Sequence, residues 1–223
     1  YLRPMPQLSA VIITFNEARN IARCLDSLSG IADEVLVLDS FSTDQTEQIC
    51  RERGVRFIQH AFDGHIEQKN RALAAAAHPL VLSLDADEAL SDTLRQSILA
   101  VKNNWRYDAY AMNRRTNYCG QWIAHSGWYP DRKVRLFDRR LGQWGGTNPH
   151  DRVEMLPAAR MSRLEGDLLH YSYYTVEEHV ARARKYADIA AAAMHRQGKR
   201  GAWWRMWLSP VAKFCRNYFL KLG

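Results

Sequence analysis

The residues with the clearest chemical potential are Asp85 and Asp87, which directly follow the apolar run Leu80–Leu84. Side chains two positions apart on an extended segment point to the same side, so both carboxylates can approach one ligand. Hard divalent cations prefer such oxygens, and Mg²⁺ or Mn²⁺ held there would complete its shell with diphosphate oxygens. Asp-x-Asp alone is common in surface turns. Its place after a buried strand favours a cation site, because unsatisfied carboxylates are costly there.

Two further polar groups also follow apolar runs. The segment 14–17 (Thr-Phe-Asn-Glu) comes after Val11–Ile13, and Asp39-Ser40 comes after Val35–Leu38. In an open parallel sheet, ligands bind beyond the carboxyl ends of the strands. We therefore expect the three polar groups to converge on one ligand.

Alternating apolar runs and helix-period segments predict the elements that position these groups. Buried strands are expected around residues 11–13, 35–38, 55–58 and 80–82. Helices are expected around 21–28, over 65–77 and around 94–101. A further helix is expected to begin after Ser42 and Gln45, which resemble a capping box. This βαβαβαβα order predicts an α/β fold with a mainly parallel sheet flanked by helices.

The pattern changes after Tyr107. Residues up to about Leu169 are expected to form longer loops with one strand over 133–137, and Thr175 is expected to cap a helix that reaches Gly198. We predict one domain over 5–172 and a C-terminal helical segment over 173–223. Met5 is the expected native start, and more protein is expected after Gly223.

Four stretches of the first hundred residues resemble one family. SAVIITFNEARNIARCLDSL, DEVLVLDSFSTDQT, EQKNRALAAA and VLSLDADEAL are similar to the inverting glycosyltransferases of family 2, which have the GT-A nucleotide-sugar-binding fold, a Rossmann-like half included. GWYPDRKVRLF, NPHDRVE and LLHYSYYTVEEHVARARKYA resemble the branch that adds glucose or a similar sugar to the inner core of lipopolysaccharide or lipooligosaccharide.

The resemblance implies roles for individual residues. Thr14, Asn16 and Glu17 would line the nucleotide, and Asp39 would meet its base. By the same resemblance, Lys69 would lie near the nucleotide or its phosphates, Asp85 would face the ribose or sugar, and Asp87 would bind the metal.

Inverting transfer also needs a carboxylate to take the proton of the acceptor hydroxyl. We assign this role to Asp151, although the branch often has His-Glu where this chain has His150-Asp151. A loop carboxylate paired with Arg152 is the alternative reading, and Asp131 is the next candidate base. Attack opposite the leaving group would convert an α-linked sugar nucleotide into a β-glycoside.

Several other side chains have both a functional and a structural interpretation. His170 is a candidate metal ligand or diphosphate contact, or a hydrogen-bonded core histidine. Arg132 and Arg135 either contact phosphates or form the solvated face of a strand. Aromatic side chains either stack on sugar rings or pack on their own domain; they are Trp122, Trp128, Tyr129 and Trp144.

The formal net charge of +7 is concentrated at the end of the chain. Seven basic residues and no acidic one follow Met194, so the first 194 residues are balanced. The tail also holds Trp203, Trp204 and Trp207, a composition typical of a helix in the headgroup layer of an anionic membrane. Solvated cations beside packed aromatics are the alternative. No window has the roughly 18 apolar residues of a spanning helix, and no signal peptide is recognised.

The sequence thus predicts a metal-dependent glycosyltransferase, peripheral on the cytoplasmic face of a bacterial inner membrane. Its expected donor is a UDP-sugar, with glucose the expected sugar, and its expected acceptor is a lipid-linked glycan such as a lipid A core heptose. Alternatives are a polyprenyl-phosphate glycosyltransferase, a sugar nucleotidyltransferase, and a nucleic-acid-binding protein using the basic tail. A nucleotidyltransferase is expected to have a glycine-rich phosphate-binding loop after the first strand, where this chain has TFNEARN. A neutral body and an apolar tail argue against nucleic acid.

Overall fold

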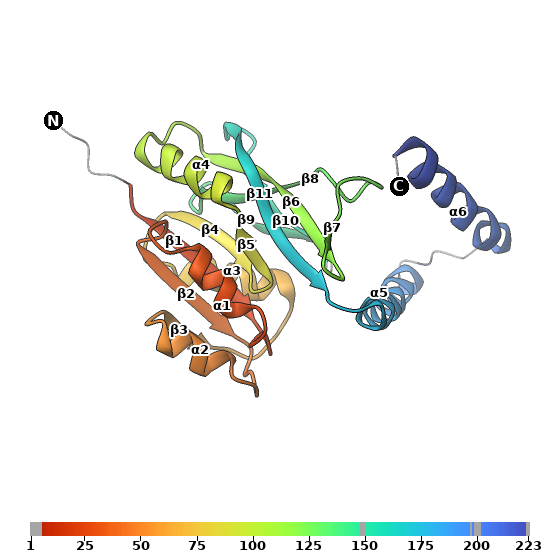
Figure 1. The fold of residues 1–223 in the computed structure, drawn as a ribbon, viewed down its shortest axis with the longest axis horizontal. Coiled ribbons are helices and arrows are strands. Elements are labelled where there is room, and N and C mark those ends of the chain that lie inside the picture. The colour runs from red at the N-terminus through yellow and green to blue at the C-terminus, as the bar shows by residue number, and fades with distance from the viewer. Residues whose placement is uncertain (1–5, 148–149, 197, 199–201, 222–223) are drawn as a thin grey trace. The chain divides into compact units, whose positions relative to one another are not determined.

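The computed structural model describes residues 6–147, 150–196, 198 and 202–221 (Figure 1). Met5 and Gly223, which the sequence analysis named, lie outside these residues, as do Lys199 and Arg200, two of the seven basic residues after Met194. The chain divides into two compact units. Unit 1 comprises the residues up to Arg114 together with Arg132–His170, and unit 2 comprises Arg115–Asp131 and Tyr171–Gly223.

The first half alternates strands and helices as predicted. Its elements are β1 (Leu8–Thr14), α1 (Ile21–Ser27), β2 (Glu34–Asp39), α2 (Thr46–Glu52), β3 (Arg56–Gln59), α3 (His65–Ala75), β4 (Leu80–Asp85), β5 (Glu88–Leu90) and α4 (Asp92–Asn103). Strands β3, β2, β1 and β4 lie side by side in parallel. The predicted α/β class, with a mixed, mostly parallel and curled sheet flanked by helices, is confirmed.

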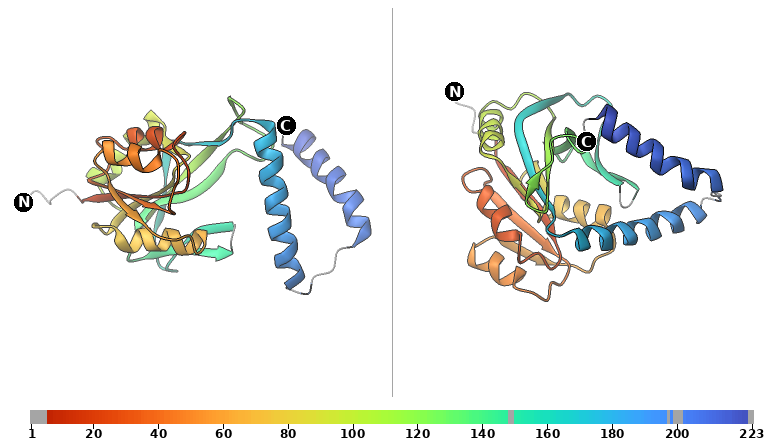
Figure 2. Two further views of the ribbon diagram at one scale, coloured as in Figure 1. Left: turned by 90° about the horizontal axis from the view of Figure 1, so that it is seen from below. Right: turned by 45° about the vertical axis from the view of Figure 1, so that its right-hand side comes forward.

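The core explains why the strands are apolar on both faces. Ala10 and Ile12 of β1 pack with the buried side chains of α1, α2 and α4, whereas Val11 packs on the other face with Ala72 and Leu73 of α3. Because successive side chains of a strand alternate between faces, a sheet covered on both sides needs apolar residues at every position. Figure 2 shows α1 and α2 on one side of these strands and α3 on the other.

The second half contains more strand than the sequence indicated. Besides the predicted strand β8 (Asp131–Asp138), it has β6 (Ala109–Tyr118), β7 (Gln121–Trp122), β9 (Gly142–Thr147), β10 (His150–Met155) and β11 (Met161–Tyr173). The expectation of long loops over 107–169 is therefore wrong. Three of the six residues of strand β9, GQWGGT, are glycines, which are depleted in strands, and Trp144 is its one buried residue among those described.

These strands extend the sheet on one side. Within the described residues it has nine strands, in the order β3-β2-β1-β4-β8-β6-β11-β5 with β7 on β6, while β9 and β10 form a separate antiparallel pair. The predicted capping box before α2 is also absent: Gln45 precedes α2 without a side-chain cap, and the Ser42 hydroxyl donates to Asp39 instead.

Unit 2 contains the helices α5 (Val176–Arg196) and α6 (Trp203–Cys215) and the short π-helical turn η1 (Arg216–Leu220). The predicted cap of α5 is confirmed, because the Glu178 amide donates to the Thr175 hydroxyl and the Tyr174 amide donates to the Glu178 carboxylate. Tyr118, Tyr173 and His179 pack their rings together at the start of this unit. Across the part of the chain that is described, we find no helix with the length and apolarity needed to cross a bilayer.

Candidate active site

The strand register brings three of the predicted site residues to one edge of the sheet. Thr14 of β1 is aligned with Asp39 of β2, and Ile13, one residue earlier, is aligned with Asp85 of β4. Because the three strands are parallel, the loops that follow them leave the sheet on the same side. The expected convergence of the polar groups is therefore present in unit 1.

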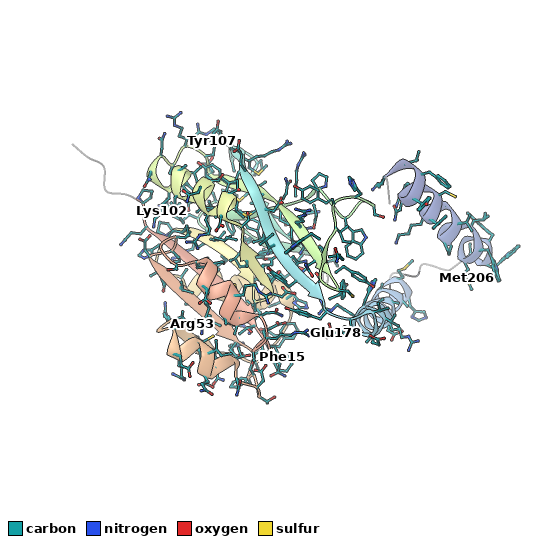
Figure 3. The ribbon with its side chains drawn as sticks, viewed as in Figure 1. Phe15, Arg53, Lys102, Tyr107, Glu178 and Met206 are labelled. Atoms are coloured by element: carbon teal, nitrogen blue, oxygen red, sulfur yellow. The ribbon has the colours of Figure 1, made fainter. Side chains whose placement is uncertain are left out.

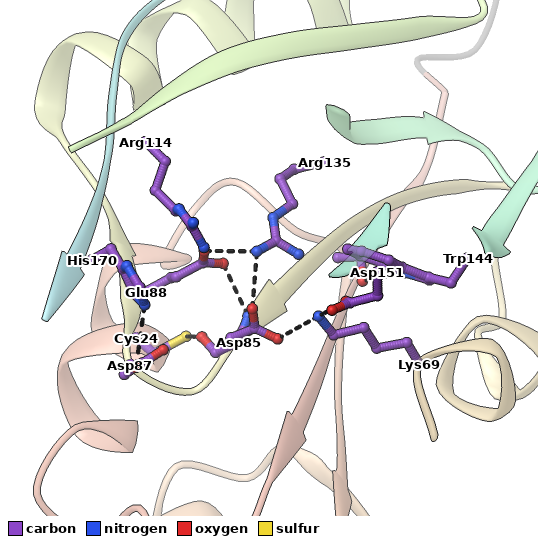
Figure 4. A network of polar contacts seen from close by, with 11 residues as sticks. Cys24, Lys69, Asp85, Asp87, Glu88, Arg114, Arg135, Trp144, Asp151 and His170 are labelled. Carbon is purple, nitrogen blue, oxygen red and sulfur yellow. Dashed lines mark hydrogen bonds and ion pairs between the residues drawn. The ribbon is translucent and has the colours of Figure 1, made fainter. Parts of the chain in front are cut away.

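Asp85 lies between two cations. One carboxylate oxygen is 2.9 Å from Lys69 Nζ and the other is 2.9 Å from Arg135 Nη2 (Figure 4). Burial opposes ionisation of this carboxyl, but the positive charges of Lys69 and Arg135 outweigh it and hold its pKa well below the ordinary value. Asp85 therefore holds both cations at this edge of the sheet.

Asp87 is paired instead with His170. Its Oδ2 lies 3.4 Å from His170 Nε2, and the backbone accounts for the approach because His170 of β11 is aligned with Glu88 of β5. This pairing brings together the two residues predicted to hold a metal. In the described residues no group of three or more His, Cys, Asp or Glu side chains is arranged to hold an ion. A two-residue site still suits Mg²⁺ or Mn²⁺, which commonly take their remaining ligands from water and substrate phosphates.

Asp151, the predicted base, contacts Lys69. Its Oδ2 is 2.6 Å from Lys69 Nζ, so this one ammonium group bridges Asp85 and Asp151. The alternative pairing of Asp151 with Arg152 is not what the structure has, since Arg152 binds Glu154. The side chain of His150 lies outside the described residues.

The strand pair β9–β10 carries Asp151 to this position. Asp151 is aligned with Gly146 of β9, and β9 is fixed to α3 by Asn70, whose side chain both donates to the Trp144 carbonyl and accepts from the Trp144 amide at 2.9 Å. Lys69 immediately precedes Asn70 on α3. One turn of α3 therefore both anchors the strand pair and supplies the ammonium group that contacts Asp151.

Arg135, a predicted phosphate contact, and Glu88 form the buried part of this network, and the sequence did not indicate their pairing. Arg135 is only 2% exposed, so a solvated strand face is wrong for it, whereas Arg132 is exposed. Arg135 Nη2 donates to Glu88 at 2.7 Å, and Glu88 also accepts from the Asp85 amide at 3.0 Å. Burial opposes the charge of Arg135, but Glu88 and Asp85 outweigh it and raise its pKa. The acidic run 85–88 was the available signal for Glu88.

Trp144 packs on its own unit rather than presenting a free ring to a sugar. It is 4% exposed, its indole nitrogen donates to the Ser83 hydroxyl, and both cations face its ring, Lys69 Nζ at 4.1 Å and the Arg135 guanidinium at 5.1 Å from the centroid. A desolvated cation over a tryptophan ring is stabilised by the ring quadrupole. We call Lys69, Asp85, Glu88, Arg135 and Asp151 the charged end of the site.

Two other predicted residues, Asn16 and Asp39, belong to a hydrogen-bonded end of the site, which also contains Ser42, Asp44 and Thr46. Asn16 has a positive φ of 53°; its amide donates to Ser42 and its side-chain oxygen accepts from the Thr43 amide, each at 2.8 Å. Asp39 is fully buried and accepts from the Ser42 amide and hydroxyl. These bonds tie the loop after β1 to the loop after β2.

The remaining candidates take other positions. Glu17 donates its amide to the Thr46 hydroxyl at 2.9 Å, and Thr14 is buried beside the same loops. Trp122, Trp128, Tyr129 and the alternative base Asp131 belong to unit 2. Cys24 is buried next to the carboxylates, and burial, reinforced by the Glu88 charge, raises its pKa well above the ordinary value, so it does not supply a thiolate.

Comparisons with known proteins identify the family. The model of Glycosyl transferase family 2 matches residues 9–165, which contain the whole charged end. An uncharacterized glycosyltransferase of Rickettsia typhi is 31% identical, covering 97% of this chain and 79% of that protein. The lipopolysaccharide core biosynthesis glycosyltransferase LpsC of Rhizobium meliloti is 28% identical, covering 97% and 82%.

The solved structure of TarS residues 1–349 from S. aureus is similar in fold, with a TM-score of 0.53 at 19% identity. The match covers 74% of this chain and 60% of the TarS fragment. Because the family model spans more than half of the chain, and a relative at 31% identity is covered over 79% of its length, the chain belongs to Glycosyl transferase family 2.

Proposed function

We propose that this chain is a metal-dependent, inverting hexosyltransferase that moves glucose from UDP-glucose to a lipid-linked acceptor such as a core heptose of lipopolysaccharide. The observation that carries the proposal is the meeting of Asp85, Asp87, His170 and Asp151 at the carboxyl edge of the sheet. Family membership favours sugar transfer over the nucleotidyltransferase and nucleic-acid alternatives.

The choice of substrates rests on the relatives. LpsC is described as an enzyme of lipopolysaccharide core biosynthesis, which supports a lipid-linked core acceptor here. TarS, whose fold is similar, has been crystallised with UDP and with UDP-GlcNAc. We take a uridine nucleotide as the donor to test first. Such an acceptor would also place the enzyme at the cytoplasmic face of a bacterial inner membrane.

The donor set fits a divalent cation. Asp87 supplies an oxygen and His170 a nitrogen, and a nucleotide diphosphate would supply further oxygens. When bound, the cation would neutralise charge on the departing nucleotide diphosphate. We assign the metal to Asp87 and not to Asp85, whose two oxygens contact Lys69 and Arg135.

Asp151 is the proposed general base. The acceptor oxygen attacks the anomeric carbon, the bond from that carbon to the diphosphate breaks with its electrons on the leaving group, and the hydroxyl proton passes to the Asp151 carboxylate. Lys69 Nζ, 2.6 Å from Asp151 Oδ2, holds this carboxylate in place for the step. Because attack and departure are on opposite faces, an α-linked donor gives a β-glycoside.

Buried polar atoms without partners lie at the same edge. Among the described residues, Thr14 Oγ1 and the Nε and Nη1 atoms of Arg135 are buried with no hydrogen-bond partner. Such atoms are costly unless a ligand satisfies them. Hydroxyl and phosphate oxygens of a sugar nucleotide are groups of the required kind.

The test is a panel of sugar nucleotides added to the full chain with Mg²⁺ or Mn²⁺. A ligand that binds only the folded protein raises its melting temperature, so UDP-glucose should do so when the metal is present. The Asp87→Asn variant should lose this shift, whereas Asp63→Asn, at an exposed ion pair with Arg71, should keep it. Equal shifts in all three proteins, or none with any donor, would overturn the proposal. Product analysis with core heptose and polyprenyl phosphate acceptors then separates the two lipid-linked alternatives.

A further inference from the structure

Helix α6 of unit 2 carries a continuous apolar face that is exposed to solvent. Trp203 and Trp207 are 76% and 74% exposed, and side chains at the following helical turns are exposed as well; they are Leu208, Val211 and Phe214. Spacings of three and four residues place these side chains on one face of an α-helix. Met206, labelled in Figure 3, also projects from α6. Contiguous apolar surface of this kind marks a binding surface.

The charge around this face has one sign. No acidic residue occurs from His195 to the end of the sequence, and Lys213, Arg216 and Lys221 are exposed. Two open hollows of about 350 and 400 Å³ lie between residues 125–130 and the α6–η1 segment. Lys221 lines the first and Lys213 the second, where Phe214 and Tyr218 are its neighbours. Cations and apolar side chains are therefore interleaved on one surface.

The positive charge around α6 indicates an anionic partner. A symmetric pairing of two copies through α6 would bring the lysines and arginines of both copies together, and like charges at an interface are unfavourable. An anionic lipid surface instead offers phosphates to the cations and acyl chains to the apolar face. Tryptophan and aliphatic side chains beside Lys and Arg suit the boundary between headgroups and acyl chains.

We propose that α6 and η1 form a membrane-binding surface that lies in the headgroup layer of an anionic bilayer. Trp203, Trp207 and Phe214 insert between the lipids, and Lys213 and Arg216 contact lipid phosphates. The surface is built from unit 2 residues alone, so its binding to lipid does not depend on the donor site.

Cosedimentation of the full chain with vesicles tests the proposal. We expect binding to vesicles of phosphatidylcholine and phosphatidylglycerol in equal parts, little binding to phosphatidylcholine alone, and weaker binding as salt increases. Combined Trp203→Ser, Trp207→Ser and Phe214→Ser substitutions should weaken binding by at least about tenfold. A matched control, Leu156→Ser with Met161→Ser, removes exposed apolar side chains from unit 1 and should leave binding unchanged.

A second variant tests the charge independently. Lys213→Glu with Arg216→Glu keeps the apolar face and should weaken binding to the anionic vesicles by roughly tenfold or more. No binding by the unaltered chain, or equal binding by the apolar-face variant, would overturn the proposal. So would a dimer, seen by light scattering, that dissociates in the apolar-face variant without any vesicle binding. Vesicle binding without a donor-induced melting shift would retain this inference and reject the proposed donor.

Discussion

The two ends of the candidate site are built from different interactions. The charged end joins residues far apart in sequence through ion pairs, such as Lys69 with Asp151 and Arg135 with Asp85. The hydrogen-bonded end joins the loops after two adjacent strands, as in the bond from the Asn16 amide to Ser42. The geometry of the charged end therefore depends on compensation between buried charges, and that of the hydrogen-bonded end depends on loop conformation.

This difference sets the expected cost of a substitution. Removing one member of a buried ion pair leaves the other charge without compensation, which costs several kcal/mol. Removing one hydrogen bond near the surface costs about 1 kcal/mol. The charged end should therefore respond strongly to single changes, and the hydrogen-bonded end weakly.

The largest effect is expected for Asp151→Asn. An amide cannot accept the hydroxyl proton, so kcat should fall by about 10³-fold, within the usual range for a lost general base. Steady-state transfer assays measure this, and thermal unfolding checks that the fold is kept. Glu154→Gln on the same strand breaks only an exposed pair with Arg152 and should leave kcat within about twofold. Turnover of Asp151→Asn close to the unaltered rate would remove Asp151 from the mechanism.

Lys69→Met should lower the free energy of unfolding by about 3 kcal/mol, because Asp151 loses its ion-pair partner and Asp85 keeps only Arg135. Urea unfolding measures the change. Lys102→Met is the matched control: its partner Asp33 is half-buried, and the expected loss is about 1 kcal/mol. If Lys69 and Asp151 are coupled, the double variant with Asp151→Asn should lose less than the sum of the two single losses. Additive losses would contradict the bridge.

The hydrogen-bonded end could largely be predicted, because parallel strands carry their terminal residues to one edge whatever their side chains are. Asp39 of this end needed only the apolar run before it, and the same argument placed Thr14 beside it and Asp85 of the charged end at the same edge. The contact of Lys69 with Asp151 could not be predicted in this way. Asp151 is positioned by the pairing of its strand with β9, and the glycine-rich sequence of β9 does not indicate a strand. The burial of Arg135 was missed because its partner Glu88 forms a three-residue strand that no periodicity can indicate.

A smaller effect is expected for Asn16→Ala. Its positive φ of 53° is tolerated by Asn and Gly better than by Ala, and the bond to the Thr43 amide is also lost. The free energy of unfolding should fall by about 1–2 kcal/mol. Asn16→Gly loses the same bond but keeps the backbone freedom, so it should lose less. Equal losses in the two variants would assign the whole cost to the side-chain bond.

The smallest effect, and one that depends on pH, is expected for Asp44→Asn. Burial opposes ionisation of Asp44, but bonds from the Thr46 hydroxyl and the Ala18 and Thr46 amides outweigh it and lower its pKa from 3.8. A pKa lowered in the folded state stabilises the fold at pH values above that of the unfolded group and ceases to do so as pH falls through the folded value. The variant should be about 1 kcal/mol less stable at neutral pH, and the difference should shrink below about pH 4. Urea unfolding across this range measures it. A difference that stays constant with pH would show that the Asp44 charge does not hold these loops together.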